Sequence, residues 1–392
     1  MPNPTSDVLQ FIHALDFDAL PDPVIRQARR CLLDLCGVAA AGGTTRLSRI
    51  VRDHAALHYG ASGLGARMLF DGRRVSLPGM VLAGAASIDS VDAHDGHVLT
   101  KGHVGVTVLP VVLALADAGL ILSGRALLAA LVLGYEVATR AGVALHATAC
   151  DYHTSGAWNS LAAAALTARA LGLAVDKTRE ALGIAEYFAP RSQMMRCIEH
   201  PTMVKDGSGW GAMTGVSAAL LAADGFTGAP AVLLENSAVA SLWQDLGRRW
   251  AIMEQYFKPY PVCRWAQPAV EAALSLARAY AVPSEGIVSI RVSTFHEAAR
   301  LATRHPATTE AAQYSLPFAV ASALRHGDLG VAGITGAALQ DAEIARLGQA
   351  VVLAEDPGYS ARACAADSFG RPWPRWANRI GRIWTRPNRP GC

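Results

Sequence analysis

Apolar residues recur at helical spacing through the first 260 or so positions of the chain. Residues 22–43 begin with Asp-Pro, carry apolar side chains three and four positions apart, and end in a glycine pair, which predicts one complete helix. Several later segments are apolar on all sides, a pattern typical of central helices that other helices cover. The same scheme predicts further helices at 108–119, 123–145, 155–172, 176–189 and 209–225.

The pattern changes in the last third of the chain. Residues 286–295 alternate β-branched and polar side chains, which predicts a half-buried strand. Residues 316–327 read as a helix that ends in glycine, and 341–356 read as a helix followed by a strand. We therefore expect a mainly α fold, with a large all-helical domain over 1–264 and a smaller α+β lid domain over 265–365.

The remaining residues, 366–392, show neither the helical nor the strand periodicity of apolar residues. They are predicted to form an irregular tail rich in Arg, Trp and Pro. Residues 371–392 hold six arginines, three tryptophans and no acidic residue. Three interpretations stay open: a poorly ordered end, a basic anchor for an acidic partner or membrane surface, or a reading frame that shifted near residue 360.

Composition narrows the class of protein. Hydrophobic residues make up 52% of the chain and charged residues 17%, so we expect a large buried interior. The formal net charge is +3, and the tail's six arginines more than account for it. The body of the protein is therefore not expected to bind nucleic acid.

Cysteines and apolar runs indicate the compartment. The seven cysteines are odd in number and contain no CxxC pair, which favours a reducing environment over disulfides or a zinc knuckle. The first residues lack a secretory signal pattern. The most apolar run, 104–124, is broken by Pro110 and Asp117 and is expected to be a buried helix rather than a membrane span. We expect a cytoplasmic protein that does not bind membranes.

Residues 92–105 concentrate the candidate chemistry. Three of the twelve histidines and two aspartates lie there, interrupted by glycines. His94 and His97 beside carboxylates could hold a metal ion. Alternatively the histidines exchange protons while aspartates orient them. A solvated loop without chemistry is the third interpretation, and acid–base use is the favoured one, with no metal.

Cationic side chains elsewhere suit an anionic ligand. Lys205 precedes a helix of small residues, and helix N-termini favour negative charge. Lys258 and Arg264 flank a proline-stiffened turn near the expected domain junction, where clefts commonly form. His153 directly precedes another helix. Each of these residues taken alone has an ordinary structural role as its simplest explanation.

Several common enzyme signatures are missing from the sequence. It holds no GxGxxG after a strand, no GxxxxGK[ST], no HExxH and no GxSxG. The sequence therefore gives no motif support for dinucleotide binding, P-loop chemistry, zincin proteolysis or α/β-hydrolase chemistry.

Taken in order, the segments resemble the MmgE/PrpD family, which includes 2-methylcitrate dehydratase, cis-aconitate decarboxylase and iminodisuccinate epimerase. The resemblance covers about residues 20 to 330 and implies a helical domain with an α+β lid. It also implies work without metal or organic cofactor, usually as a homodimer. The matching segments are 28–42, 83–97, 102–117, 153–173, 203–228, 258–272 and 308–324.

The resemblance also implies roles for individual residues. Asp92 and Asp95 match the first and last aspartates of the family's DxDD stretch, and His103 matches the histidine of its HPS segment. His153, Lys205 and Lys258 match the histidine before the next helix, the glycine-loop lysine and the lysine before YPxC. The chain departs from the family at His94 in place of an aspartate, at Gly96 or His97 in place of a threonine, and at Gln267 in place of a histidine.

These matches imply a lyase that dehydrates a small hydroxy-polycarboxylate similar to 2-methylcitrate or citrate. Epimerisation or decarboxylation of a related acid is the alternative within this chemistry, and a metal-dependent hydrolase or an inactive helical scaffold are the alternatives outside it. The expected roles divide into proton exchange or orientation (Asp92, His97, His103, His153) and substrate binding (Asp95, Lys205, Lys258, Arg264).

Overall fold

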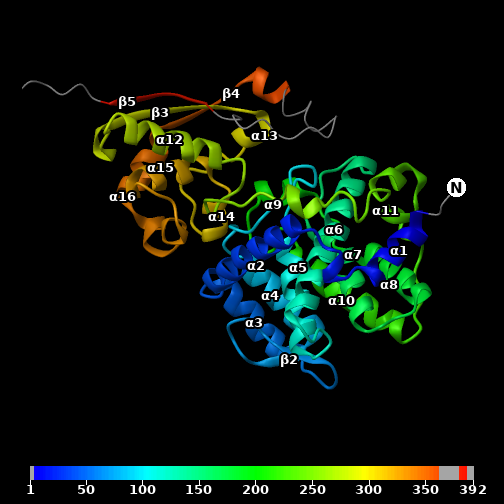
Figure 1. The fold of residues 1–392 in the computed structure, drawn as a ribbon. Helices are drawn as coiled ribbons and strands as arrows, with labels where there is room; N and C mark the ends of the chain where they lie inside the picture. Colours follow the sequence, from blue (N-terminus) through cyan, green and yellow to red (C-terminus); the bar gives the residue numbers. More distant parts are fainter. Residues whose placement is uncertain (1–3, 362–378, 386–392) are drawn as a thin grey trace, which may run out of the picture. The chain divides into compact units, whose positions relative to one another are not determined.

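A computed structural model describes residues 4–361 and 379–385, and the fold is mainly α. The chain divides into two compact units. Unit 1 comprises Met1–Ser90, His94–Met195 and Val204–Phe257, and unit 2 comprises Val91–Ala93, Arg196–Met203 and Lys258–Cys392. Figure 1 shows the elements of both units.

Unit 1 is built from helices and one small hairpin. All six helices expected from the sequence are present. The hairpin consists of strands β1 (Gly65–Arg67) and β2 (Arg74–Ser76). The hydrophobic pattern did not indicate it. The helices are α1 (Pro4–Ala14), α2 (Asp22–Gly42), α3 (Arg46–His58), α4 (Leu77–Asp89), α5 (Gly105–Asp117), α6 (Gly124–Thr148), α7 (Gly156–Ala170), α8 (Val175–Phe188), α10 (Ser208–Ala223) and α11 (Val232–Glu235), with 3-10 turns η1 (Phe17–Ala19), η2 (Ser237–Leu242) and η3 (Ala251–Glu254). The short helix α9 (Met194–Glu199) begins in unit 1 and ends in unit 2.

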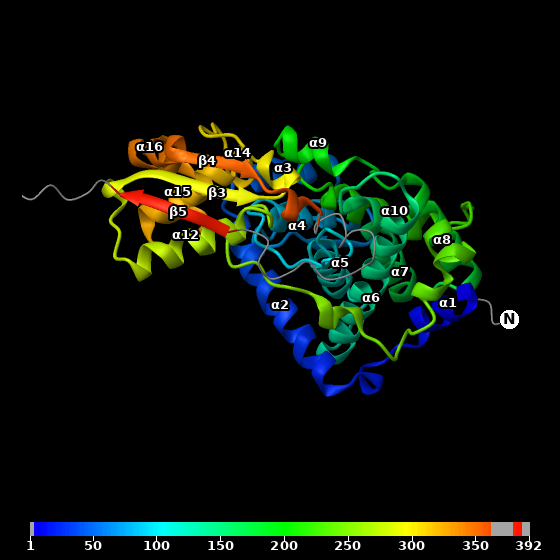
Figure 2. The same cartoon turned by 90° about the horizontal axis from the view of Figure 1, so that it is seen from above.

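Helix α7 is the centre of unit 1. It lies between α6 and α10, as Figure 2 shows, and nearly all of its residues are buried. Small residues allow this packing: a Cβ atom at Gly211 of α10 would lie 2.7 Å from the Cα atom of Gly156. The backbones of α7 and α10 are therefore in direct contact near their N-termini.

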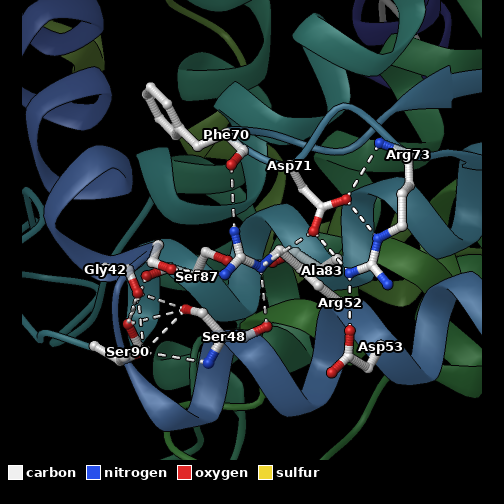
Figure 3. Close-up of polar contacts among 12 residues, drawn as sticks. Gly42, Ser48, Arg52, Asp53, Phe70, Asp71, Arg73, Ala83, Ser87 and Ser90 are labelled. Atoms are coloured by element: carbon white, nitrogen blue, oxygen red, sulfur yellow. Dashed lines mark hydrogen bonds and ion pairs between the residues drawn. The ribbon is translucent and has the colours of Figure 1, made fainter.

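Buried hydroxyl groups join the ends of α2 and α4. Ser48 of α3 and Ser90, the C-cap of α4, both donate to the Gly42 carbonyl, at 2.6 and 3.2 Å (Figure 3). A surface network continues beyond them, in which Arg73 pairs with Asp53 at 2.9 Å and with Asp71 at 2.6 Å. Exposed ion pairs of this kind contribute little to stability, whereas the two serines satisfy the Gly42 carbonyl at the end of α2.

Helix α6 is long and apolar enough to cross a membrane, and 78% of its apolar window is buried inside the protein. No other helix among residues 4–361 and 379–385 meets the same length and composition criteria. The run 104–124, expected as a buried helix, contains α5, most of whose residues are buried.

Unit 2 is a small α+β structure. From Ile290 to Thr294, strand β3 (Ile287–Thr294) alternates buried and less buried residues as expected, and β3 pairs parallel with β4 (Val351–Glu355). Figure 1 shows α12, α15 and α16 on one face of this sheet. The helices are α12 (Gln267–Ala279), α13 (His296–Ala299), α14 (Thr309–Gln313), α15 (Leu316–His326) and α16 (Ala342–Ala350), with 3-10 turns η4 (Ser284–Gly286), η5 (Val331–Ile334) and η6 (Gly336–Gln340).

Capping explains the bounds of α15. Ser315 accepts the Phe318 N–H at 3.0 Å, Pro317 occupies the first turn, and Gly327 ends the helix at φ +73°.

Most of the expected irregular tail, 366–392, lies outside the described residues. Within it, strand β5 (Arg379–Thr385) pairs antiparallel with β3, so the sheet has the order β4-β3-β5. The sequence pattern gave no indication of this strand.

Candidate active site

The candidate site in unit 1 centres on the histidine loop, defined as residues 94–103, which leads into α5. His94 and Asp95 are fully buried, and His97 is 2% exposed. Two backbone bridges shape the loop: His97 pairs with Gly102, and Gly96 pairs with Tyr256. The interpretation of this stretch as a solvated loop is therefore wrong.

His103 is held by three hydrogen bonds. Its N–H donates to Ser155 Oγ at 2.9 Å, and its carbonyl accepts from Asn159 Nδ2 at 2.8 Å. Its ring Nδ1 lies 2.6 Å from the Asp95 carbonyl oxygen. Because a carbonyl can only accept, Nδ1 carries the proton of the neutral ring and Nε2 is the basic nitrogen.

His153 shows the same ring arrangement. Its Nδ1 lies 2.7 Å from the Asp151 carbonyl, which again makes Nε2 the basic nitrogen. Its N–H donates to His146 Nε2 at 3.2 Å. Burial, together with nearby Lys101 and His153, lowers the pKa of His146 to about 4, so His146 stays neutral near pH 7.

His97 is bonded to protein through both ring nitrogens. Nδ1 accepts the Thr100 N–H at 3.3 Å, so Nε2 carries the proton and bonds to Glu254 Oε2 at 3.1 Å. The hydrogen bond from His97 lowers the pKa of the Glu254 carboxyl, and Arg249 lowers it further. These contacts connect the histidine loop to the segment that precedes Lys258.

Asp95 is the second residue of the histidine loop, and it is fully buried. Its Oδ1 accepts the Gly105 N–H at 3.1 Å, and its Oδ2 accepts the Tyr135 hydroxyl. Complete burial raises the pKa of this carboxyl to about 7. Its carboxylate is therefore bonded to the backbone of α5 and to α6.

Lys205 lies in the turn before α10 and is 3% exposed. The neighbouring Asp206 accepts the Ser155 hydroxyl at Oδ2, and its carbonyl accepts the Gly156 N–H at 3.1 Å. The start of α7 thus connects the turn of Lys205 with the loop of His103. The sequence analysis singled out both of those residues but missed Ser155, Asn159 and Asp206.

Three site residues adopt left-handed backbone conformations that non-glycine residues rarely take. Asp92, Lys101 and Lys205 have φ values of +48°, +49° and +48°. Such strain is concentrated at functional sites, where the surrounding structure enforces it.

In unit 2, Lys258 and Asp92 form a buried ion pair. Lys258 Nζ lies 2.6 Å from Asp92 Oδ1, and the side chains are 0% and 4% exposed. Gln267 donates to the carbonyls of Tyr260 and Val262 at 2.9 and 3.0 Å, which fixes the turn after Lys258. Arg264, the other expected anion ligand, has an exposed side chain.

A metal ion has donors of suitable type in this region. The rings of His94 and His103 have centroids 4.2 Å apart, and the Asp92 carboxylate comes two residues earlier along the chain. Imidazole and carboxylate suit zinc or iron. The same groups also suit metal-free acid–base chemistry.

The described residues thus combine a mainly helical unit with a small α+β unit, and they include histidines with basic Nε2 nitrogens and buried lysines. The model of the MmgE/PrpD N-terminal domain matches residues 6–243, and that of the MmgE/PrpD C-terminal domain matches residues 260–373. The chain belongs to the MmgE/PrpD family.

Individual relatives are decarboxylases by name. The chain is 27% identical over 240 residues to the cis-aconitate decarboxylase-like protein oryM of Aspergillus oryzae, covering 58% of this chain and 48% of that protein. A cis-aconitate decarboxylase of Aspergillus terreus shows 27% identity over 240 residues, covering 58% and 47%. A second one from that species shows 25% identity over 308 residues, covering 70% and 60%. The chain thus spans about half the length of the first two relatives.

Proposed function

We propose that this protein is a cofactor-independent lyase that removes a proton next to a carboxylate of a small polycarboxylate. Dehydration of a 2-methylcitrate- or citrate-like hydroxy acid is the first candidate. We further propose that it acts in the cytoplasm as a homodimer. The observation that carries the proposal is the bonding of His103, whose tautomer makes Nε2 a base at a fixed position.

The proposed chemistry uses each group in one role. His103 Nε2 takes the proton from the carbon next to a carboxylate, and negative charge builds up on that carboxylate. The ammonium groups of Lys205 and Lys258 each bind a substrate carboxylate and stabilise the charge. His153, which enters the step protonated at Nε2 as well as at Nδ1, donates the Nε2 proton to the departing hydroxide, so that water leaves and a carbon–carbon double bond forms. The proton that His103 has taken passes to solvent and one from solvent returns to His153 before the next turnover.

Asp92, Asp95, His97 and Arg264 complete the proposed set. Asp92 orients the Lys258 ammonium through its 2.6 Å contact. His97 acts as an additional acid or, through its bonds to Thr100 and Glu254, as a support for the histidine loop. Asp95 and Arg264 are kept as substrate-binding candidates.

Decarboxylation is the second candidate, because two of the matched relatives are named cis-aconitate decarboxylases and the third is named a cis-aconitate decarboxylase-like protein. Epimerisation of iminodisuccinate is a third outcome of the same proton abstraction. Mass spectrometry after incubation with 2-methylcitrate, citrate, cis-aconitate and iminodisuccinate separates them. Loss of water indicates a dehydratase, loss of carbon dioxide a decarboxylase, and stereochemical change at constant mass an epimerase.

His103→Asn tests the base. The Asn amide can still donate to the Asp95 carbonyl, so the fold is expected to persist while kcat falls by about 10²- to 10⁴-fold. His54→Asn, at an exposed position of α3, is the matched control and is expected to keep full activity. A His103→Asn enzyme with near-normal kcat would exclude His103 as the base.

Metal analysis separates the proposal from a metal-dependent hydrolase. Purified enzyme is expected to turn over equally well before and after EDTA treatment. Stoichiometric zinc or iron together with loss of activity in EDTA would favour the hydrolase instead.

A further inference from the structure

The Ser155 hydroxyl lies between two segments that are far apart in the sequence. Ser155 Oγ accepts the His103 N–H at 2.9 Å and donates to Asp206 Oδ2. Ser155 is 1% exposed and Asp206 is 2% exposed, so water does not substitute for either contact. The result is a buried chain of two hydrogen bonds from the histidine loop to the turn that carries Lys205.

The direction of this chain follows from the chemistry of its members. Ser155 Oγ accepts the main-chain N–H of His103 and donates its single proton to Asp206 Oδ2. The lone pairs of Ser155 Oγ are then oriented to receive the His103 N–H. The carboxylate lies at the N-termini of α7 and α10, helices of 15 and 16 residues whose dipoles favour negative charge there.

The backbone around the chain leaves little room for movement. The Gly156 N–H donates to the Asp206 carbonyl at 3.1 Å, and a Cβ atom at Gly156 would lie 2.7 Å from the Gly207 carbonyl carbon. The turn therefore lies directly against the start of α7. Loss of either hydrogen bond of Ser155 is therefore expected to displace both His103 and the turn that carries Lys205.

We propose that Ser155 and Asp206 are positioning residues that set the location of His103 relative to the Lys205 turn. The inference rests on the proposed function, because the location matters for turnover only if His103 exchanges the substrate proton. Neither residue needs to touch the substrate. The two act through the His103 main-chain N–H and the turn before α10.

Ser155→Ala removes both hydrogen bonds. It is expected to lower kcat by about 10- to 100-fold through misplacement of the base, while KM changes less than about threefold. Ser160→Ala is the matched control, since Ser160 is a buried serine five residues further along the chain, in α7. Its hydroxyl has no hydrogen-bond partner among the described residues, so kcat is expected to stay at the wild-type value.

Asp206 is tested by a pair of variants. In Asp206→Asn the amide oxygen can still accept the Ser155 hydroxyl, so kcat is expected to fall only about threefold. Asp206→Ala has no acceptor and is expected to match the Ser155→Ala loss. Equal kcat values for the Asp206→Asn and Asp206→Ala variants would overturn the assignment of Asp206 as a positioning residue. This comparison remains valid even where Ser155→Ala fails to fold.

Amide hydrogen exchange supplies a readout that does not depend on turnover. The His103 amide is expected to exchange at least tenfold faster in Ser155→Ala than in wild type or Ser160→Ala, with α6 amides unchanged. Unchanged His103 exchange and unchanged kcat in Ser155→Ala would overturn the inference. If wild type turns over none of the four acids, the proposed function fails, while the exchange data still decide whether Ser155 holds the loop.

Discussion

At the scale of single residues, the histidines of unit 1 differ in how their rings are bonded. His103 and His153 use Nδ1 as the donor to a main-chain carbonyl, whereas His97 uses Nδ1 as an acceptor. His146 accepts through Nε2 and is buried near Lys101. The tautomer therefore separates His97, whose proton lies on Nε2, from His103, His146 and His153, whose proton lies on Nδ1.

His146 is expected to make the protein less stable in acid. Its pKa is about 4 in the folded protein and 6.5 in the reference state, so the unfolded chain binds more protons between these values. Its contribution to the free energy of unfolding is present above pH 6.5. That contribution is lost as pH falls toward 4, by up to about 1.4 kcal/mol per pH unit.

Urea unfolding at several pH values between 4 and 7 measures this dependence. His146→Gln is expected to show a shallower loss of stability in acid than wild type. His54→Gln on the exposed face of α3 serves as the control and is expected to follow the wild-type curve. Parallel curves for wild type and His146→Gln would show that His146 does not carry the effect.

The sequence predicted the chemical types at the site better than their partners. His103 and Lys205 stand out because they lie in glycine-broken stretches before helices. The contacts of Ser155 could not be predicted, because it lies 52 residues from His103 and 51 residues from Asp206, and only the packing of α7 on α10 brings these segments together. The Lys258–Asp92 pair likewise joins residues 166 positions apart.

At the scale of elements, the contact between α7 and α10 depends on glycine. A Cβ atom at Gly211 would lie 2.5 Å from the Gly156 carbonyl oxygen and 2.7 Å from its Cα atom. Gly37, inside α2, has no atom within 4 Å of the same position. The two helical glycines therefore respond differently to one added methyl group.

Gly211→Ala is expected to destabilise the protein by about 1–3 kcal/mol, because backbone atoms cannot move aside for the methyl group. Gly37→Ala is expected to stabilise it by about 0.5–1 kcal/mol, since alanine costs less backbone entropy in a helix. Denaturant unfolding of both variants checks the contrast. A neutral Gly211→Ala variant would mean that the two helices can separate without loss.

The hydrophobic pattern predicted the secondary structure of the longer segments correctly. Helices α5, α6, α7 and α10 and strand β3 all appear where periodicity placed them. The hairpin of β1 and β2 was missed because three residues per strand are too few to show alternation. Strand β5 was missed because its partner β3 lies about 90 residues away, and its arginine-rich sequence lacks a strand pattern.

At the scale of the whole molecule, the family assignment and the buried lysines predict that polycarboxylates bind the folded protein. Citrate at a hundredfold excess over its Kd is expected to stabilise wild type by about 2.7 kcal/mol and to raise Tm. Lys205→Met is expected to lose most of that rise. Lys177→Met, a variant of the lysine on α8 that donates to the Ala223 carbonyl at 2.7 Å, is the control and is expected to keep the rise.

Differential scanning fluorimetry with citrate, cis-aconitate and 2-methylcitrate makes this comparison. A wild-type Tm that none of the three acids changes would favour the inactive helical scaffold over an enzyme for polycarboxylates.

The left-handed backbone at Asp92, Lys101 and Lys205 has a consequence for engineering. Glycine adopts this conformation freely, so glycine at any of the three positions would relieve strain on the order of 1 kcal/mol. A redesign guided by thermostability alone would be drawn to these positions, and at Asp92 and Lys205 it would delete candidate functional side chains. If the proposed function holds, heat resistance and turnover are set in opposition at those two residues.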